Sequence, residues 1–142
     1  DGKYPCCYRG IENPWGSVYE FVDGVNITDH QAWVCRDAAQ YASNVFAHPY
    51  EKLSYLNHDA NGYATEMGHD PNLPFAGFPV TVGGSSTTRY ADYYHQAAGQ
   101  RVALVGGGWH HGAYAGLSFW ALDISSGSAG VYMGGRLLKR PL

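Results

Sequence analysis

Histidine is the residue type that most invites a metal or proton-transfer site in this sequence, because the chain contains seven of them. His110 and His111 are adjacent, and neighbouring side chains on a strand point to opposite faces, so this pair is poorly placed to chelate one ion. His58 and His69 flank a turn-rich loop, and neither HExxH nor CxxC occurs. Residues 57–62 resemble the start of a calcium loop but lack its third oxygen ligand and distal glutamate. The sequence therefore predicts neither a metal site nor a cofactor.

The sequence also lacks the motifs of nucleophilic catalysis. No Gly-x-Ser-x-Gly elbow is present, and Cys35 lies in no recognisable activating motif. Residues 106–108 are three consecutive glycines, but the Lys-Ser/Thr of a phosphate-binding loop does not follow them. Acidic pairs such as Asp23 with Asp29 fall in turn-like segments, where we expect solvated surface. No motif specifies a reaction, and we predict that the protein is not an enzyme.

The segment 109–126 has the composition of a binding surface. It combines Tyr, Trp, Ser and Gly, and rigid aromatic rings give contact area at low entropic cost while Ser and Gly adapt. The same aromatic residues could instead fill a β-core, and both descriptions hold if the segment is divided. In that case we expect Trp109, Leu117, Trp120 and Leu122 to face inward and the residues between them to face outward.

The composition excludes several classes of protein. Only 15% of the 142 residues are charged, 15% are aromatic and 19 are Gly, which is unlike an intrinsically disordered chain. The net charge of −3 without a Lys/Arg cluster predicts no nucleic-acid partner. No apolar run reaches the roughly 18 residues that a membrane span needs, so we predict no membrane insertion. Residues 1–142 fit a single compact domain.

Three cysteines leave two possibilities open. Cys35 could form one disulfide with Cys6 or Cys7 in an oxidising compartment, or all three could be small half-buried apolar side chains. The chain begins without an initiator Met or a signal segment, so we expect the C-terminal part of a longer protein. The apolar and basic residues 134–142 are expected to pack back onto the domain.

Short strands and turns dominate the predicted secondary structure. Residues 18–22 and 25–27 are β-prone and flank the turn dipeptide Asp23-Gly24, which predicts a hairpin. We expect strands over 31–35 and 101–105, and a short helix within 36–45. Residues 51–79 are rich in turn signals and predict a long irregular segment, whereas the tyrosine spacing of 89–98 predicts a small helix or a tyrosine-lined loop.

Three segments resemble a known family. Residues 13–24 resemble the Gly-Asn-Val-Trp-Glu-Trp-Val signature of formylglycine-generating-enzyme-like domains, a branch of the C-type lectin fold. Residues 106–109 and 131–137 resemble the Gly-Gly-x-Trp and closing Ile-Gly-x-Arg elements of that family. Residues 7–16 are similar to carboxy-terminal domains of phage tail and other surface proteins, including the variable proteins of diversity-generating retroelements. The resemblance implies an α+β, C-type-lectin-like fold, loop-rich with short antiparallel strands and few short helices.

The resemblance also implies a set of variable residues. Such proteins carry diversified positions after the Gly-Gly-Trp turn, where mutation at adenines rewrites Asn codons. The side chains are then expected to form an exposed receptor-binding face on an invariant scaffold. The corresponding positions in this sequence are His110, His111, Tyr114, Ser118, Phe119, Ala121, Asp123, Ile124, Ser128, Gly130 and Tyr132.

Departures from the family exclude two of its activities. The enzyme branch uses a late pair of cysteines, and this sequence has no cysteine after Cys35, so we expect no formylglycine-type oxidation. The Glu-Pro-Asn and Trp-Asn-Asp elements of calcium-dependent sugar binding are absent as well.

The sequence thus favours a non-enzymatic domain that binds a protein or glycan receptor. We expect it at a phage tail or fibre, or on a bacterial cell surface, repeated on a symmetric homo-oligomer such as a trimer, where avidity multiplies weak sites. Two alternatives stay open. One is a structural virion module, a decoration or fibre-tip domain without a ligand, and the other is an enzyme that modifies a surface polymer.

Overall fold

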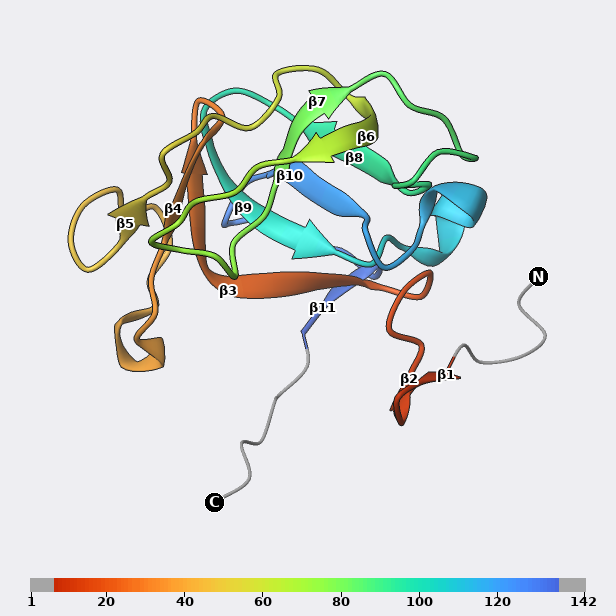
Figure 1. Ribbon diagram of the computed structural model, residues 1–142. Coiled ribbons are helices and arrows are strands. Elements are labelled where there is room, and N and C mark those ends of the chain that lie inside the picture. Colours follow the sequence, from red (N-terminus) through yellow and green to blue (C-terminus); the bar gives the residue numbers. More distant parts are fainter. Residues whose placement is uncertain (1–6, 136–142) are drawn as a thin grey trace.

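A curled β-sheet makes up most of the molecule (Figure 1). The computed structural model describes residues 7–135, of which 38% lie in strands and 7% in helices. Both helices are 3-10 helices, η1 (Ala38–Gln40) and η2 (Trp109–Tyr114). The predicted α+β, C-type-lectin-like fold class is therefore wrong, because the described residues form a mostly β structure.

The main sheet contains nine strands, and most neighbours are antiparallel. Two pairs are parallel: β8 (Tyr93–Gln96) pairs with β10 (Trp120–Ile124), and β11 (Met133–Gly134) pairs with β3 (Tyr19–Thr28). A separate hairpin joins β1 (Cys7–Tyr8) to β2 (Ile11–Glu12). The order across the main sheet, apart from β11, is β5 (Glu51–Lys52), β4 (Gln31–Val34), β3 (Tyr19–Thr28), β9 (Gln100–Val105), β10 (Trp120–Ile124), β8 (Tyr93–Gln96), β6 (Gly62–Met67) and β7 (Pro79–Val82).

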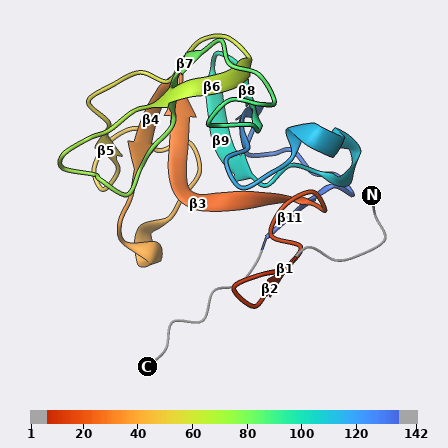
Figure 2. The same ribbon diagram turned by 45° about the vertical axis from the view of Figure 1, so that its right-hand side comes forward.

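The longest strand, β3, replaces the predicted hairpin at Asp23-Gly24. Its pairing with β9 shifts register between Val22 and Asn26, so the dipeptide forms a bulge inside one strand. The strand turns a corner, which is visible in both views (Figures 1 and 2). The real hairpin turn is Asp29-His30, where φ is 46° and 67°, as a two-residue turn between twisted strands requires.

Other predicted elements are confirmed in part. The strands expected over 31–35 and 101–105 are β4 and β9. The segment 89–98 contains β8, so neither a small helix nor a loop describes it fully. The segment 51–79 includes β5 and the six-residue β6 and is less irregular than predicted.

The helix expected within 36–45 shrinks to η1 because tertiary hydrogen bonds capture the backbone beyond it. Asp37 caps the three residues by accepting from Ala39 N at 3.0 Å. The buried Asn26 amide then donates to the carbonyl oxygens of Ala42 at 2.8 Å and Val45 at 3.2 Å. These carbonyls are thereby engaged with β3 instead of with a helix.

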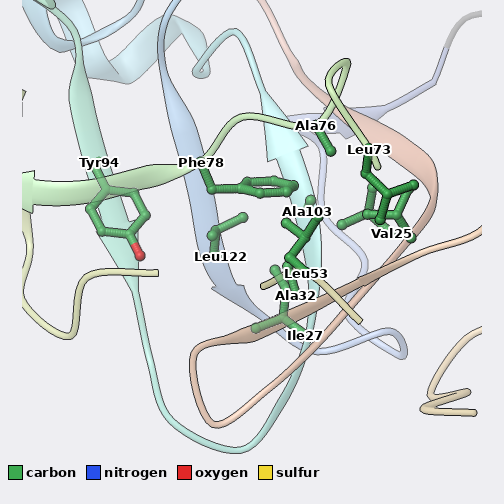
Figure 3. Packing of buried hydrophobic residues seen from close by; sticks show 11 residues of the cluster. Val25, Ile27, Ala32, Leu53, Leu73, Ala76, Phe78, Tyr94, Ala103 and Leu122 are labelled. Atoms are coloured by element: carbon green, nitrogen blue, oxygen red, sulfur yellow. The ribbon is translucent and has the colours of Figure 1, made fainter. Parts of the chain in front are cut away.

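The two sides of the sheet carry separate apolar clusters. In β9, Ala103 points to the first cluster, whereas Val102 and Leu104 point to the second. Figure 3 shows the first cluster, in which Phe78 lies against residues of the facing strands. The second cluster consists of Tyr19, Val102, Leu104, Phe119 and Ala121.

Cys35 is buried and Cys7 is exposed, and both carry free thiols. Cys6 and residues 136–142 lie outside the described residues, as does most of the segment 134–142 that we expected to pack back. Within residues 7–135, no helix has the length and apolar character needed to cross a bilayer.

Candidate functional site

A continuous group of aromatic and imidazole rings covers the second cluster. We call it the aromatic face, and its members are Tyr63, Tyr93, His95, Trp109, His110, His111, Tyr114 and Tyr132. Tyr19 and Phe119 lie beneath it, and their ring centroids are 5.5 Å apart. The face draws on β6, β8, η2 and the segment before β11, which are far apart in the chain.

One side of the aromatic face is a tyrosine triad. The ring of Tyr93 lies 5.1 Å from that of Tyr63 and 5.0 Å from that of Tyr114. Tyr93 also contacts His95 at 4.8 Å, because alternate residues of β8 share one side of the sheet. These centroid distances lie in the range where aromatic pairs attract each other beyond simple area burial.

The other side is built around His111. Its ring centroid lies 5.0 Å from Tyr19, 5.8 Å from His95 and 4.1 Å from His110. His110 in turn contacts Tyr132 at 5.2 Å and Trp109 at 5.5 Å. The adjacent histidines lie in the 3-10 helix η2, not on a strand, so their rings meet instead of pointing apart.

Two hydrogen bonds fix the tautomer of neutral His111. The backbone N–H of Gly108 donates to Nδ1 at 3.2 Å, so this nitrogen carries no proton. The proton is therefore on Nε2, which lies 2.7 Å from the Tyr19 hydroxyl oxygen and donates to it. Tyr19 keeps its own proton free for a further partner.

The glycine-rich turn 106–108 brings η2 onto β3. Gly16 N donates to Gly106 O at 2.9 Å, and Trp109 N donates to Ser17 O at 2.9 Å. Gly107 has φ of 71°, and a Cβ there would lie 2.8 Å from Cβ of Ala115. The glycines therefore allow a tight bend that seats η2 against the start of β3.

Burial and the Asp123 carboxylate shift the pKa values of three groups in and beneath the aromatic face. Burial lowers the pKa of His95, and nearby Asp123 partly offsets the effect. Burial lowers the pKa of His111 as well, and His110 lowers it further. Burial and Asp123 raise the pKa of Tyr19 to about 12. These shifts favour the neutral forms of all three groups at neutral pH.

Four of the predicted variable residues gather on the aromatic face. His110, His111, Tyr114 and Tyr132 lie on it, and His110 and Tyr114 are exposed. Asp123 is partly buried and acts on this face through its charge.

Two of the predicted residues cannot belong to an exposed surface. Phe119 is 0% exposed and Ala121 is 1% exposed, because both point into the second cluster. The expectation of an exposed face is wrong for these two positions. The pairing register of β10 turns Ala121 toward the second cluster. Phe119 lies at the end of the turn that precedes β10, and it is buried in the same cluster.

The remaining predicted residues lie at the margin of this region. Ser118 is anchored through its backbone N–H, which donates to Asp92 at 2.7 Å. Ile124 packs against the second cluster, and Ser128 lies 2.9 Å from Ser125, hydroxyl to hydroxyl. Gly130 lies against the ring of Tyr132.

The division of 109–126 into inward and outward residues is wrong at Trp109, Leu117, Phe119 and Ala121 and is confirmed only for the inward positions of Trp120 and Leu122. Leu122 is buried, and Trp120 packs against the first cluster. Trp109 and Leu117, which were expected to face inward, are each 66% exposed. Both lie outside the strand, in η2 and the turn after it, where strand alternation does not apply.

Five rings of this region were not predicted from the sequence. They are Tyr19, Tyr63, Tyr93, His95 and, as an exposed member, Trp109. The alternation of Tyr93 and His95 about buried Tyr94 could have identified β8 as a strand with one aromatic side. Nothing in the sequence indicates that β6 and β8 meet η2.

Tyrosine, tryptophan and histidine rings supply the chemical groups of the aromatic face. Among the described residues, no group of three or more His, Cys, Asp or Glu side chains is placed to hold a metal ion. In the same part of the chain, no serine or cysteine side chain hydrogen-bonds to one of the histidines of the face. The rings offer surfaces for stacking and groups for hydrogen bonding.

Comparison with known proteins finds no matching family model, no similar curated protein and no similar solved structure.

Proposed function

We propose that this chain is a non-enzymatic binding domain that presents the aromatic face to a protein or glycan receptor on a cell surface. The observation that carries the proposal is the exposure of large rings above a fixed aromatic layer. Trp109 is 66% exposed and Tyr114 is 47% exposed, although both contact other rings. Exposed aromatic patches of this kind supply the anchors of most binding surfaces.

The pre-arranged geometry of the rings supports the same function. Tyr19 and Phe119 hold the layer beneath, and the Gly108–His111–Tyr19 hydrogen bonds fix the orientation of one imidazole. A surface that is already ordered loses little conformational entropy when it binds, which favours affinity. The lowered pKa values of His95 and His111 favour their neutral forms, so shape and hydrogen bonding would contribute to the selection of the partner.

The exposed rings provide a direct test. We expect the triple variant Trp109→Ala, His110→Ala, Tyr114→Ala to lose receptor binding by a factor of 100 or more, since two anchor residues typically cost at least about 3 kcal/mol together. Binding of the labelled domain to intact bacterial cells and to a glycan array, both measured by fluorescence, reports the effect.

A matched control replaces exposed apolar residues elsewhere. Leu56 and Phe75 are as exposed as Trp109, and Leu56→Ala, Phe75→Ala should bind cells or glycans as the parent does. Equal loss in both variants, or full binding by the triple variant with an unchanged circular dichroism spectrum, would show that the face is not the receptor site.

The structural virion module predicts a different result. Such a domain would bury the aromatic face against neighbouring chains, so the triple variant would change the oligomeric state rather than cell binding. Light scattering of the parent and the variant distinguishes the two functions. A parent that stays monomeric at all concentrations contradicts the structural module and also the expected trimeric display.

The finer part of the proposal is that the protein is a variable protein of a diversity-generating retroelement, at a phage tail tip or cell surface. It is supported by the position of His110, His111, Tyr114 and Tyr132 on one face. The burial of Phe119 and Ala121 limits diversification to the other positions. Coding DNA with a reverse transcriptase gene and an imperfect repeat that differs at adenines in those four codons would support it, and their absence would refute it.

A further inference from the structure

Two adjoining cavities lie at the corner of β3, away from the aromatic face. One has a volume of about 280 Å³ and the other about 150 Å³. Both are lined by Val22, Asp23, Val25 and Tyr41, so they meet at the β-bulge. The proposed receptor-binding function uses neither of them.

The larger cavity is shaped for an apolar ring system. Phe78 and Trp120 form one wall, with ring centroids 4.8 Å apart. Val34 and Ala76 complete the apolar lining, and Phe75 lines the same cavity while remaining 64% exposed. A cavity of roughly 150 Å³ accommodates benzene, so this one has room for two fused rings.

The walls of the larger cavity are fixed in place by the fold. Buried Asp70 accepts hydrogen bonds from Ser54 N and Asn72 N, each at 2.8 Å, and so holds the turn that carries Ala76. The Tyr55 hydroxyl donates to Ala76 O at 3.0 Å and accepts from Phe78 N at 3.2 Å. A pre-formed pocket of this kind is typical of small-molecule sites.

The shared wall carries one charge. Among the described residues that line either cavity, Asp23 is the only charged one, and it is exposed. Its carboxylate makes no ion pair or side-chain hydrogen bond with another described residue. An unpaired carboxylate beside an apolar cavity attracts a cation that is attached to an apolar body.

We propose that these cavities form a binding site for a small aromatic primary amine. The ring system occupies the larger cavity against Trp120 and Phe75, with the buried Phe78 behind them, and the ammonium group lies at the bulge beside the exposed Asp23 carboxylate. The smaller cavity, lined also by Asn26 and Ser43, supplies polar surroundings for the ammonium.

Three probes of similar shape and different charge test the site. Titration calorimetry and proton NMR at pH 7 compare tryptamine, a cation, with neutral indole and anionic indole-3-acetate. We expect tryptamine to bind about fivefold more tightly than indole, the gain of a partly exposed ion pair, and indole-3-acetate to bind most weakly. Absence of saturable tryptamine binding, or equal binding of all three probes, overturns the proposal.

Two variants separate the contributions of charge and cavity. Asp23→Asn should remove the preference for tryptamine and leave indole binding unchanged. Ala76→Leu should fill the larger cavity and weaken both probes at least about tenfold, since the ring would lose most of its buried area. Ala113→Leu, an exposed position in η2, is the matched control and should bind as the parent does. A preference for tryptamine that survives Asp23→Asn overturns the proposal.

A measurement on the parent protein keeps the test decisive if Ala76→Leu fails to fold. Intermolecular nuclear Overhauser effects should connect the indole ring protons of tryptamine with the Val34 methyl groups and the Phe78 ring. Effects confined to residues of the aromatic face would place the ligand elsewhere and overturn the proposal. The proposed receptor binding of the aromatic face is tested separately, by binding to cells and glycans. A failure of the amine proposal therefore does not affect the outcome of that test.

Discussion

At the scale of single residues, His111 is the most constrained member of the aromatic face. Its Nδ1 accepts from Gly108 N–H, and its Nε2 proton is directed to the Tyr19 hydroxyl. Protonation of the imidazole places a second proton on Nδ1, which abolishes the bond to Gly108 at the start of η2. The folded structure therefore requires His111 to be neutral, because its hydrogen bond with Gly108 exists only when Nδ1 carries no proton.

This constraint predicts that stability falls in mild acid. The pKa values of His95 and His111 are lowered in the folded state by burial, so between those values and about 6.5 the unfolded chain binds more protons. The free energy of unfolding should be fully retained above pH 7 and should decline as the pH falls through 6. Urea unfolding followed at pH 7.5, 6.0 and 5.0 measures this slope.

The variant His95→Gln, His111→Gln identifies the source of the slope. We expect a smaller decline between pH 7.5 and pH 5.0 than in the parent, although the variant is less stable at pH 7.5 because the ring contacts are lost. An unchanged decline would assign the acid sensitivity to other groups.

The residue-level content of the site could be predicted only in part from the sequence. Tyr, His and Trp in 109–132 indicated a binding surface, and four of the predicted positions do lie on the aromatic face. Phe119 could not be recognised as buried, since the same residue type serves both a core and a surface. Tyr19 and His95 were missed because their role depends on contacts with η2, far away in the chain.

At the scale of elements, the bulge in β3 depends on Gly24. Its φ is 78°, and a Cβ would lie 2.6 Å from the Tyr41 ring and 2.9 Å from the Cys35 carbonyl oxygen. Gly24→Ala should therefore add the cost of a left-handed alanine to that of overpacking, about 3 kcal/mol in total. Guanidinium unfolding measures the change in the free energy of unfolding.

Two other glycines separate the two costs. Gly10 has φ of 81° but open space around its Cβ direction, so Gly10→Ala should cost only about 1 kcal/mol. Gly127 has neither a positive φ nor a close neighbour, and Gly127→Ala should change stability by less than about 0.5 kcal/mol. A Gly24→Ala variant no less stable than Gly10→Ala would mean that neither the Tyr41 ring nor the Cys35 carbonyl oxygen resists the added methyl group.

The elements could be predicted where the pattern was local. Residues 31–35 and 101–105 showed β-prone runs and form β4 and β9. The dipeptide Asp23-Gly24 occurs both in hairpin turns and in β-bulges, so its composition does not distinguish the two. It is a bulge here because β3 pairs with β9 on both sides of it. The fold class was wrong because it followed from the resemblance and not from the strand pattern, whereas the described residues are mostly β. The helix expected within 36–45 is shortened because Asn26 holds its backbone, a tertiary contact that no local pattern shows.

At the scale of the whole molecule, one sheet supports two different surfaces. The first cluster backs the cavity that Phe78 and Trp120 line, and the second cluster backs the aromatic face. Strands β9 and β10 contribute side chains to both clusters. We therefore expect the two sides to unfold together.

Core truncations on opposite sides test this cooperativity. Leu122→Ala in the first cluster and Leu104→Ala in the second should each lower the free energy of unfolding by about 3 kcal/mol. In both variants, the unfolding midpoints from tryptophan fluorescence and from far-ultraviolet circular dichroism should shift together. Leu117→Ala, at an exposed position, should have little effect. Midpoints that separate in either variant would mean that the two sides unfold independently.

The parallel pairing of β11 with β3 has a consequence for how the chain is made. Tyr19 N donates to Tyr132 O at 2.7 Å, and the rings of these residues are 6.0 Å apart, so the aromatic face joins the beginning of the sheet to its last strand. On the ribosome, Tyr19 emerges long before Tyr132, whereas the β3–β4 hairpin can pair at once. The aromatic face is thus completed only when synthesis has passed β11, and until then Tyr19 lacks its contact with Tyr132.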